Sequence, residues 1–164
     1  SPPPPPAGGG GLGEGSVTSL AGAPREPRRS EAREAILAAA AHRLSTAGYH
    51  ATTLRDVAAG VGLQAGSLYH HFASKDALVA EVMNQGVQVV HEAVEAVLAR
   101  AAELPGRERL TRAIEAHLRA SLEHSAFTSA AIKSFSFVPE AVRADNRRHR
   151  RAYEDLWSRL IDAL

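Results

Sequence analysis

The chain has 164 residues, a formal net charge of +1 at pH 7 and 45% hydrophobic residues. This length suffices for one domain, or two small ones, with a buried core. There is no cysteine, which excludes disulfides and thiolate metal sites, and the apolar runs are too short and too often interrupted by charge to span a membrane. The first residues lack the basic and apolar blocks of a secretory signal, so a cytoplasmic location is expected.

The charge is unevenly distributed along the chain. Between Arg25 and Lys75 there are seven Lys and Arg against four Asp and Glu, a net charge of +3. Between Asp76 and Val138 there are six against eight, a net charge of −2. A basic front part joined to an acidic middle part is consistent with a nucleic-acid-binding head on a body that has another task.

Residues 1–29 are predicted to form a disordered arm. Proline and glycine dominate its first 24 residues, and such a segment buries too little apolar surface to offset its ordering entropy. Arg25, Arg28 and Arg29 end the arm. Two interpretations of these arginines stay open: contacts with DNA phosphates or a minor groove, and a solvated basic linker.

The first helix is expected to begin at Ser30 as N-cap and to stop at Gly48. Glu31 and Glu34 occupy the first turn, where the helix dipole favours anions. Apolar residues at helical spacing give this helix one buried face, formed by Ile36, Leu37, Ala40 and Leu44.

A second, shorter helix is predicted to begin at Thr53. The threonine hydroxyl can cap the helix, and Asp56 stands three residues later, at the partner position of a capping box. Gly60 and Gly62 follow and allow the chain to turn sharply. The apolar face of this helix consists of Leu54, Val57, Ala58 and Val61.

The third helical segment is predicted from Gln64 to Phe72. Leu68 and Phe72 are four residues apart and point into the core, whereas the polar side chains lie elsewhere on the helix. Gly66 leaves the front of the helix bare. The outward amide, hydroxyl, phenol and imidazole groups suit a DNA backbone or base edge, and they belong to Gln64, Ser67, Tyr69, His70 and His71.

These two short helices and their turn predict a helix-turn-helix. Spacing alone supports DNA binding and plain packing about equally, because glycine turns also join helices in proteins that never contact DNA.

Ser74 is the expected cap of the next helix, with Lys75 at its first position. A cation there is unfavourable by roughly 0.3–1 kcal/mol, and a phosphate bound by Lys75 and the free N–H groups would offset this cost. We therefore expect a phosphate contact at Lys75. The remaining chain predicts four helices, over residues 75–103, 107–124 and 125–137 and from Pro139 onward, with Pro105 and Gly106 ending the first of them.

No catalytic, metal or cofactor site is predicted. The H-E-x-x-E run at His91 lacks the second histidine of a zinc-binding helix, and no nucleophile stands in a strand-turn-helix elbow. Arginines concentrate in residues 143–151. Their default interpretation is a solvated helix surface, and the functional alternative is capture of an anionic effector by guanidinium groups.

The segment T-T-L-R-D-V-A, followed by V-G-L-x-x-G-S-L-Y-H-H-F and S-K-D-A-L, resembles the signature of the TetR family of bacterial regulators. The resemblance covers about fifty residues. It implies an all-α fold with a three-helix DNA-binding head over residues 30–74 and a helical ligand-binding and dimerisation body over residues 75–164. It also implies two further helices, so the chain is expected to be incomplete at its C-terminus.

The resemblance implies a repressor that binds a palindromic operator as a homodimer and is released by a small-molecule effector. Gln64, Ser67 and Tyr69 would reach base edges or phosphates, and Thr53, His70 and Lys75 would hold the DNA backbone. A helical protein-interaction module without DNA binding is the alternative.

The resemblance further implies an effector pocket between the helices of the body. The segments F-S-F-V-P-E-A-V-R and R-R-A-Y-E-D-L-W are similar to the branch of the family that controls lipid or sterol breakdown, which implies an acyl-coenzyme A thioester as effector. Each pocket candidate is also a plain core candidate; the set comprises Met83, Val87, Val90, His117, Phe127, Phe135, Phe137 and Trp157.

Overall fold

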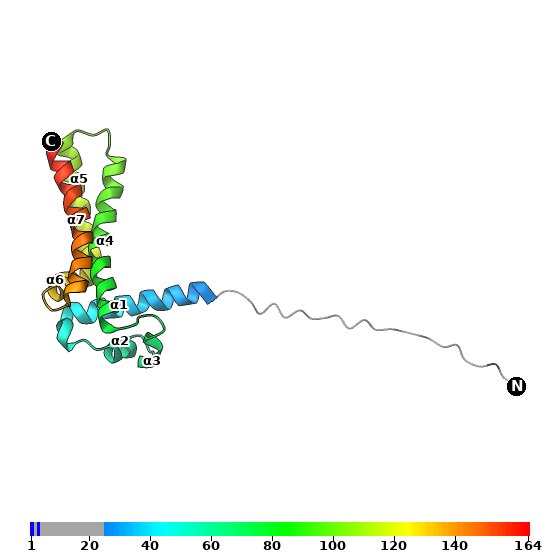
Figure 1. The fold of residues 1–164 in the computed structure, drawn as a ribbon. Coiled ribbons are helices and arrows are strands. Elements are labelled where there is room, and N and C mark those ends of the chain that lie inside the picture. Colours follow the sequence, from blue (N-terminus) through cyan, green and yellow to red (C-terminus); the bar gives the residue numbers. More distant parts are fainter. Residues whose placement is uncertain (2, 4–24) are drawn as a thin grey trace.

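The structure is a computed structural model that describes residues 1, 3 and 25–164. The described part contains helices and no strand, which confirms the predicted all-α fold (Figure 1). In chain order the helices are α1 (Arg25–Ala51), α2 (Leu54–Gly60), α3 (Ala65–Leu68), α4 (Lys75–Arg100), α5 (Gly106–Glu123), α6 (Ser125–Ser134) and α7 (Glu140–Asp162).

Helices α1, α2 and α3, here called the head, pack around one hydrophobic core. Ile36 and Leu44 of α1 and Leu68 of α3 are all completely buried in it. Burying a side chain of this size contributes about 1.5–3 kcal/mol, so these few residues hold together helices that would be marginal or unstable alone.

Helices α4 to α7, here called the body, stand on the head with α4 as the shared element (Figure 1). The first half of α4 contributes Leu78, Val82 and Met83 to the core of the head. Its second half contributes Val94 to a separate small core with Ala113 and Leu160, while α6 lies against α1. A displacement of α4 would therefore change the packing of both cores.

Helix α1 begins at Arg25, so the expectation that Ser30 is its N-cap is wrong. The Ser30 hydroxyl instead donates to the Glu34 carboxylate one turn later, at 3.1 Å. Pro27 does not stop the helix. The N–H groups of the first turn have no acceptor within a helix, so a residue without an N–H is tolerated there. Residues 25–29 of the expected arm are thus helical, whereas residues 2 and 4–24, and the side chains of Arg25 and Arg28, lie outside what the structure describes.

The other helix ends differ from expectation by a few residues. Gly48 has φ 83° and ψ 174°, so it breaks α1 as predicted, although one more turn follows. Helix α4 ends at Arg100 instead of residue 103, and α6 at Ser134 instead of residue 137. Helix α7 has Pro139 as its N-cap and not as its first residue.

Helices α4 and α6 approach each other closely at Gly86, which is buried. A Cβ atom on Gly86 would lie 2.5 Å from the backbone oxygen of Phe127 and 3.0 Å from the Ala131 Cβ. The nearest atom belongs to the backbone, so the clash cannot be relieved by a side-chain rotation.

Gly86→Ala is therefore expected to lower the free energy of unfolding by about 1–3 kcal/mol through overpacking. Urea denaturation followed by circular dichroism measures the change. Gly66→Ala in α3 is the matched control, since nothing lies within 4 Å of the added methyl group. Equal stability of the two variants would contradict the close approach of α4 and α6.

Candidate nucleic-acid interface and ligand cavity

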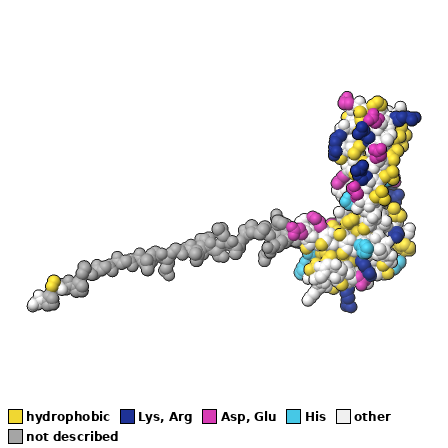
Figure 2. Space-filling model, turned by 180° about the vertical axis from the view of Figure 1, so that it is seen from behind, with side chains coloured by type: hydrophobic (Ala, Val, Ile, Leu, Met, Phe, Trp, Pro, Cys, Tyr) yellow, Lys and Arg dark blue, Asp and Glu magenta, His cyan; other side chains and the backbone are white. Residues whose placement is uncertain are grey.

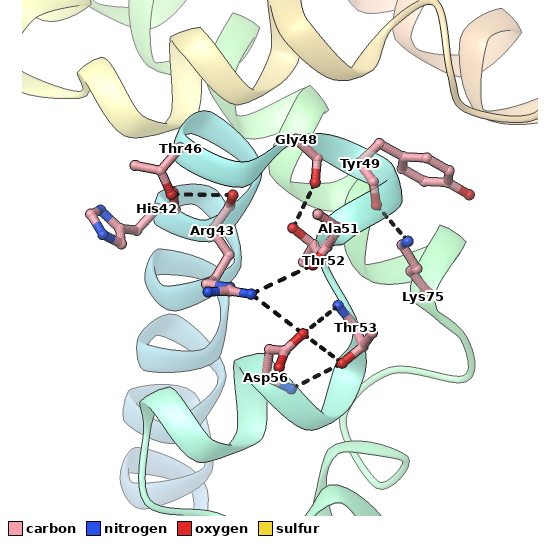
Figure 3. Close-up of polar contacts among 10 residues, drawn as sticks. All are labelled: His42, Arg43, Thr46, Gly48, Tyr49, Ala51, Thr52, Thr53, Asp56 and Lys75. Carbon is pink, nitrogen blue, oxygen red and sulfur yellow. Dashed lines mark hydrogen bonds and ion pairs between the residues drawn. The ribbon is translucent and has the colours of Figure 1, made fainter.

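Helix α2 begins with the predicted capping box, drawn in Figure 3. The Thr53 hydroxyl accepts a hydrogen bond from the Asp56 backbone N–H at 3.2 Å. The Asp56 carboxylate accepts from the Thr53 backbone N–H at 3.1 Å and from its hydroxyl at 2.7 Å. These bonds satisfy donors that the helix itself leaves free.

The hydrogen bonds from the Thr53 hydroxyl and backbone, with the nearby Arg43, hold the pKa of the Asp56 carboxyl below its usual value of 3.8. Because the pKa is lower in the folded state, this carboxylate stabilises the fold above about pH 4. The contribution is lost as the pH falls through the lowered pKa. Arg43 also ties α1 to α2, with a nitrogen 3.4 Å from Asp56 and 3.5 Å from the backbone oxygen of Ala51.

The turn between α2 and α3 depends on Gly62, whose φ is 69°. This left-handed conformation is costly for a residue with a Cβ, so glycine is favoured there. The backbone N–H of Leu63 then donates to the Ala58 oxygen at 2.9 Å and closes the turn. Gly60 was predicted to share this role, but it is the last residue of α2 and has no positive φ.

Residues 64–72, here called the recognition segment, contain a helix of only four residues, shorter than predicted. Gln64 is its N-cap and makes no side-chain cap hydrogen bond. Helical turns continue beyond the assigned end, because the backbone N–H groups of His71 and Phe72 both donate to the Leu68 oxygen, at 2.9 and 2.8 Å. The helix predicted over residues 64–72 is thus regular only at Ala65–Leu68 and continues as turns to Phe72.

The recognition segment has one buried face and one free face. Leu68 is completely buried and Phe72 is 3% exposed, as their spacing predicted. Tyr69 is 59% exposed and His70 is exposed as well. Gln64 is also exposed and Ser67 is half-buried. Within the described part of the chain, polar groups that could reach a nucleic acid are therefore accessible.

Lys75 follows the recognition segment by three residues in the chain and has a partner within the protein (Figure 3). Its ammonium group donates to the Tyr49 backbone oxygen at 2.6 Å and lies 4.1 Å from the centre of the Tyr49 ring. Burial, opposed by the neighbouring Asp76, lowers the pKa of Lys75. Tyr49 and Asp76 thus supply part of the compensation that was expected from a phosphate, and a phosphate contact at Lys75 remains a prediction.

Tyr49 in turn donates its hydroxyl to the Asp76 carboxylate at 2.6 Å. This hydrogen bond, with burial and the carboxylate charge, raises the pKa of Tyr49 to about 12. The end of α1 and the start of α4 are thereby held together by three polar contacts. The sequence contained no signal for this pairing, since the residues are 26 and 27 positions apart.

The body contains a cavity of about 520 Å³ between α4, α5, α6 and α7. This volume is in the range of small-molecule sites. Four of the eight pocket candidates line it, namely Val87, Val90, His117 and Phe135. The other lining residues are Gly86, Ser121, Thr128, Ala131, Ile132, Ser136, Asn146, Arg150, Tyr153 and Glu154.

The remaining four candidates do not line this cavity. Met83 is completely buried in the core of the head, and Trp157 packs against the small core of the body. Phe137 is 55% exposed and its ring lies 5.2 Å from that of His50. Phe127 packs against the core of the head. Met83, Phe127 and Trp157 therefore have the role that was the alternative for each candidate, which is packing in or against a core.

Several polar residues line the cavity, and two of them, Asn146 and Tyr153, have partners within the protein. The Tyr153 hydroxyl and His117 Nδ1 lie 2.8 Å apart, and burial raises the pKa of Tyr153. Asn146 is 1% exposed and donates its amide to the Asn84 side-chain oxygen at 3.0 Å. Sequence reasoning missed Asn146 and Tyr153 as lining residues, because helical spacing does not reveal where a void forms.

None of the described helices is both long enough and apolar enough to cross a membrane. Among the same residues, no three His, Asp or Glu side chains are grouped so that they could hold a metal ion.

Two family models match the chain. Residues 36–82 match the model described as bacterial regulatory proteins, tetR family. Residues 103–164 match the model of the tetracyclin repressor-like C-terminal domain. The first match covers most of the head and the second covers α5 to α7.

The HTH-type transcriptional repressor KstR2 of Mycobacterium tuberculosis is 49% identical over 51 residues. This match spans 31% of the chain and only about a quarter (26%) of the length of that repressor. Its structure, described as a ketosteroid transcriptional regulator, has a TM-score of 0.68 at 26% identity over 83% of this chain and 67% of that one.

Two other solved structures are similar over most of the chain. The TetR family regulator PfmR from Thermus thermophilus has a TM-score of 0.71 at 27% identity, over 78% of this chain and 69% of that one. The superantigen PfiT has a TM-score of 0.72 at 29% identity, over 80% and 69% of the two chains.

Thr53→Ala is expected to lower the free energy of unfolding by about 0.5–2 kcal/mol, because it removes the N-cap of α2. Thr53→Ser keeps the hydroxyl and is expected to keep most of the stability. Urea denaturation of the three proteins at pH 7 measures the difference. Equal losses in both variants would show that the threonine methyl group, and not the cap, stabilises the head.

Proposed function

This chain belongs to the TetR family of bacterial regulatory proteins, and from this premise we propose that it is a ligand-responsive transcriptional repressor. It binds a palindromic DNA operator as a homodimer in the cytoplasm and releases the operator when a small molecule occupies the body. The observation that carries the proposal is the free polar face of the recognition segment, held outward by the buried Leu68 and Phe72.

The proposed DNA contacts follow from the exposure of this face. Gln64, Ser67 and Tyr69 reach base edges or phosphates in a major groove, where amides, hydroxyls and phenols can form hydrogen bonds. His70 contacts the DNA backbone. Thr53 and Lys75 also hold the backbone, and Lys75 can do so because an ammonium group has three donors and Tyr49 accepts only one hydrogen bond from it.

The homodimer is supported by apolar side chains that the body leaves uncovered. Hydrophobic residues line one edge of the body in Figure 2. On α5, Ile114, Leu118 and Leu122 are spaced by four residues and are 43%, 55% and 76% exposed. An apolar row of this kind on a water-exposed helix is typical of a surface that another protein segment covers.

For the effector we propose an acyl-coenzyme A thioester. The cavity walls are mainly apolar, which suits an acyl or ring system, and a side hollow next to Phe135 is lined by three arginines and one carboxylate, those of Arg147, Arg150, Arg151 and Glu154. Guanidinium groups bind phosphate and carboxylate oxygens well. Occupation of the cavity would shift α4, which borders both the cavity and the core of the head, and would change the orientation of the heads.

A protein-interaction module without DNA binding is the second candidate function. The similarity to PfiT favours it, since that protein is described as a superantigen, and the uncovered apolar row on α5 could serve a protein partner. Salt dependence distinguishes the two functions. Binding to DNA through several phosphates weakens steeply as salt concentration rises, and a pure protein-interaction module binds no duplex.

Selection of bound duplexes from random DNA tests the proposed function, with a palindrome of fixed half-site spacing as the expected result. On the selected duplex, Tyr69→Ala is expected to weaken binding by about 1–3 kcal/mol, because it removes a recognition side chain. Gel-shift titration measures the affinity.

Two variants serve as controls in this titration. Tyr69→Phe separates the phenol hydroxyl from the ring, and Thr46→Ala on α1 alters an exposed hydroxyl that bonds to the backbone of its own helix. Affinity of Tyr69→Ala equal to wild type would remove Tyr69 from the interface. If the selection enriches no duplex, the proposal that the protein is a DNA-binding repressor is refuted.

Palmitoyl-coenzyme A is expected to release the selected duplex, whereas free coenzyme A is not, because only the thioester has an apolar chain to fill the cavity. Arg150→Ala is expected to raise the thioester concentration needed by roughly tenfold through loss of a charged contact. Arg159→Ala removes an arginine of α7 outside the cavity and serves as control. Release by palmitate and palmitoyl-coenzyme A at equal concentrations would contradict recognition of the coenzyme A part.

A further inference from the structure

Arg33 of α1 connects three parts of the molecule through a single guanidinium group. Its Nη1 donates to the backbone oxygen of His71 at 2.8 Å. Its Nη2 forms an ion pair with the Glu81 carboxylate of α4. The guanidinium carbon also lies 4.3 Å from the centre of the Phe72 ring. The two hydrogen-bonded partners are 38 and 48 positions away in the chain, so only the tertiary structure brings them together.

Two of these contacts fall on the end of the recognition segment. The segment has only four residues in regular helix, and a helix this short has no stable direction of its own. Its direction must be fixed by what holds its ends. Burial of Leu68 holds the middle, and at the far end Arg33 binds the His71 carbonyl and covers the Phe72 ring.

The geometry suits an arginine. The planar guanidinium fork donates to two partners in fixed directions while its flat face stacks on an aromatic ring, whereas an ammonium group has no planar face. The side chains of Arg33 and Glu81 are 39% and 38% exposed, so the ion pair alone adds little stability. The hydrogen bond from Arg33 to the His71 carbonyl has a different effect, because a strong bond from a charged donor holds the main chain in place.

We propose that Arg33 is a positioning residue for DNA recognition, which sets the angle of the recognition segment relative to α1 and α4. This inference rests on the proposed function. Arg33 itself makes no base or phosphate contact in this assignment, because its guanidinium group is directed to His71 and Glu81 within the protein. Its loss should therefore impair the discrimination between DNA sequences while leaving the electrostatic attraction to DNA unchanged.

The test compares Arg33→Gln, Arg33→Lys and Glu81→Gln in the full chain. Arg159→Gln, at an exposed position of the body, is the matched control for loss of one positive charge. Affinity is measured for the duplex that the wild type selects and for a scrambled duplex, over a series of salt concentrations. All measurements are made at a temperature where circular dichroism shows every variant fully folded.

Both Arg33 variants are expected to lose roughly tenfold affinity for the selected duplex, as for one lost charge-assisted hydrogen bond, and to keep their affinity for the scrambled duplex. The salt dependence should stay that of the wild type. Glu81→Gln, which leaves the bond to His71 in place, should show a smaller loss. The carbonyl carbon resonance of His71 should shift in both Arg33 variants and not in Arg159→Gln, which reports the lost bond without DNA.

Three results would overturn the assignment. Wild-type discrimination by Arg33→Lys would mean that only the charge matters. Equal losses on both duplexes, with a log–log salt slope smaller by about 0.9, would make Arg33 a direct phosphate contact. An unshifted His71 carbonyl resonance in the Arg33 variants would show that Arg33 does not bind this carbonyl in solution. If the wild type prefers no duplex at all, the proposed repressor function fails as well, whereas variants that discriminate normally overturn only the role of Arg33.

Discussion

The burial of Leu68 and Phe72 is the constraint on which the rest of the head depends. A helix of four residues cannot form alone, so the recognition segment exists only because these two side chains occupy the core beneath it. Their spacing of four places them on one side. The polar residues between and around them must then face outward, and Tyr69 and His70 are exposed for this reason. The same apolar contacts thus provide both stability and an accessible polar surface.

Helix α4 joins the head and the body because it contributes to the core of each. Leu78, Val82 and Met83 pack in the head, Val94 packs in the body, and Gly86 between them lets the backbone of α6 approach closely. Interiors this closely packed transmit displacements, since side chains have few alternative positions. A helix with this arrangement is suited to carry a change in the cavity to the head, in line with the proposed regulation.

Sequence reasoning predicted the cavity less well than the head. Helical spacing correctly assigned many residues to the interior of the body, but it did not separate those that touch a void from those in solid packing. Val90 and Phe135 line the cavity, whereas Met83 and Trp157 pack in or against cores. A void arises where neighbouring helices fail to interlock, and this depends on their distances and angles. Asn146 was missed because a buried amide within an arginine-rich run carries no periodic signal.

The sequence by itself determined the local features: the capping box of Thr53 and Asp56, the glycine turn at Gly62, and the inward spacing of the recognition segment. Each of these involves residues within about four positions, where backbone geometry leaves few alternatives. Only the tertiary structure decided the partner of Lys75 and the contacts of Arg33. Those hydrogen-bonded partners are 26 to 48 positions apart, and which long side chains meet depends on how the helices pack, a property that local spacing does not encode.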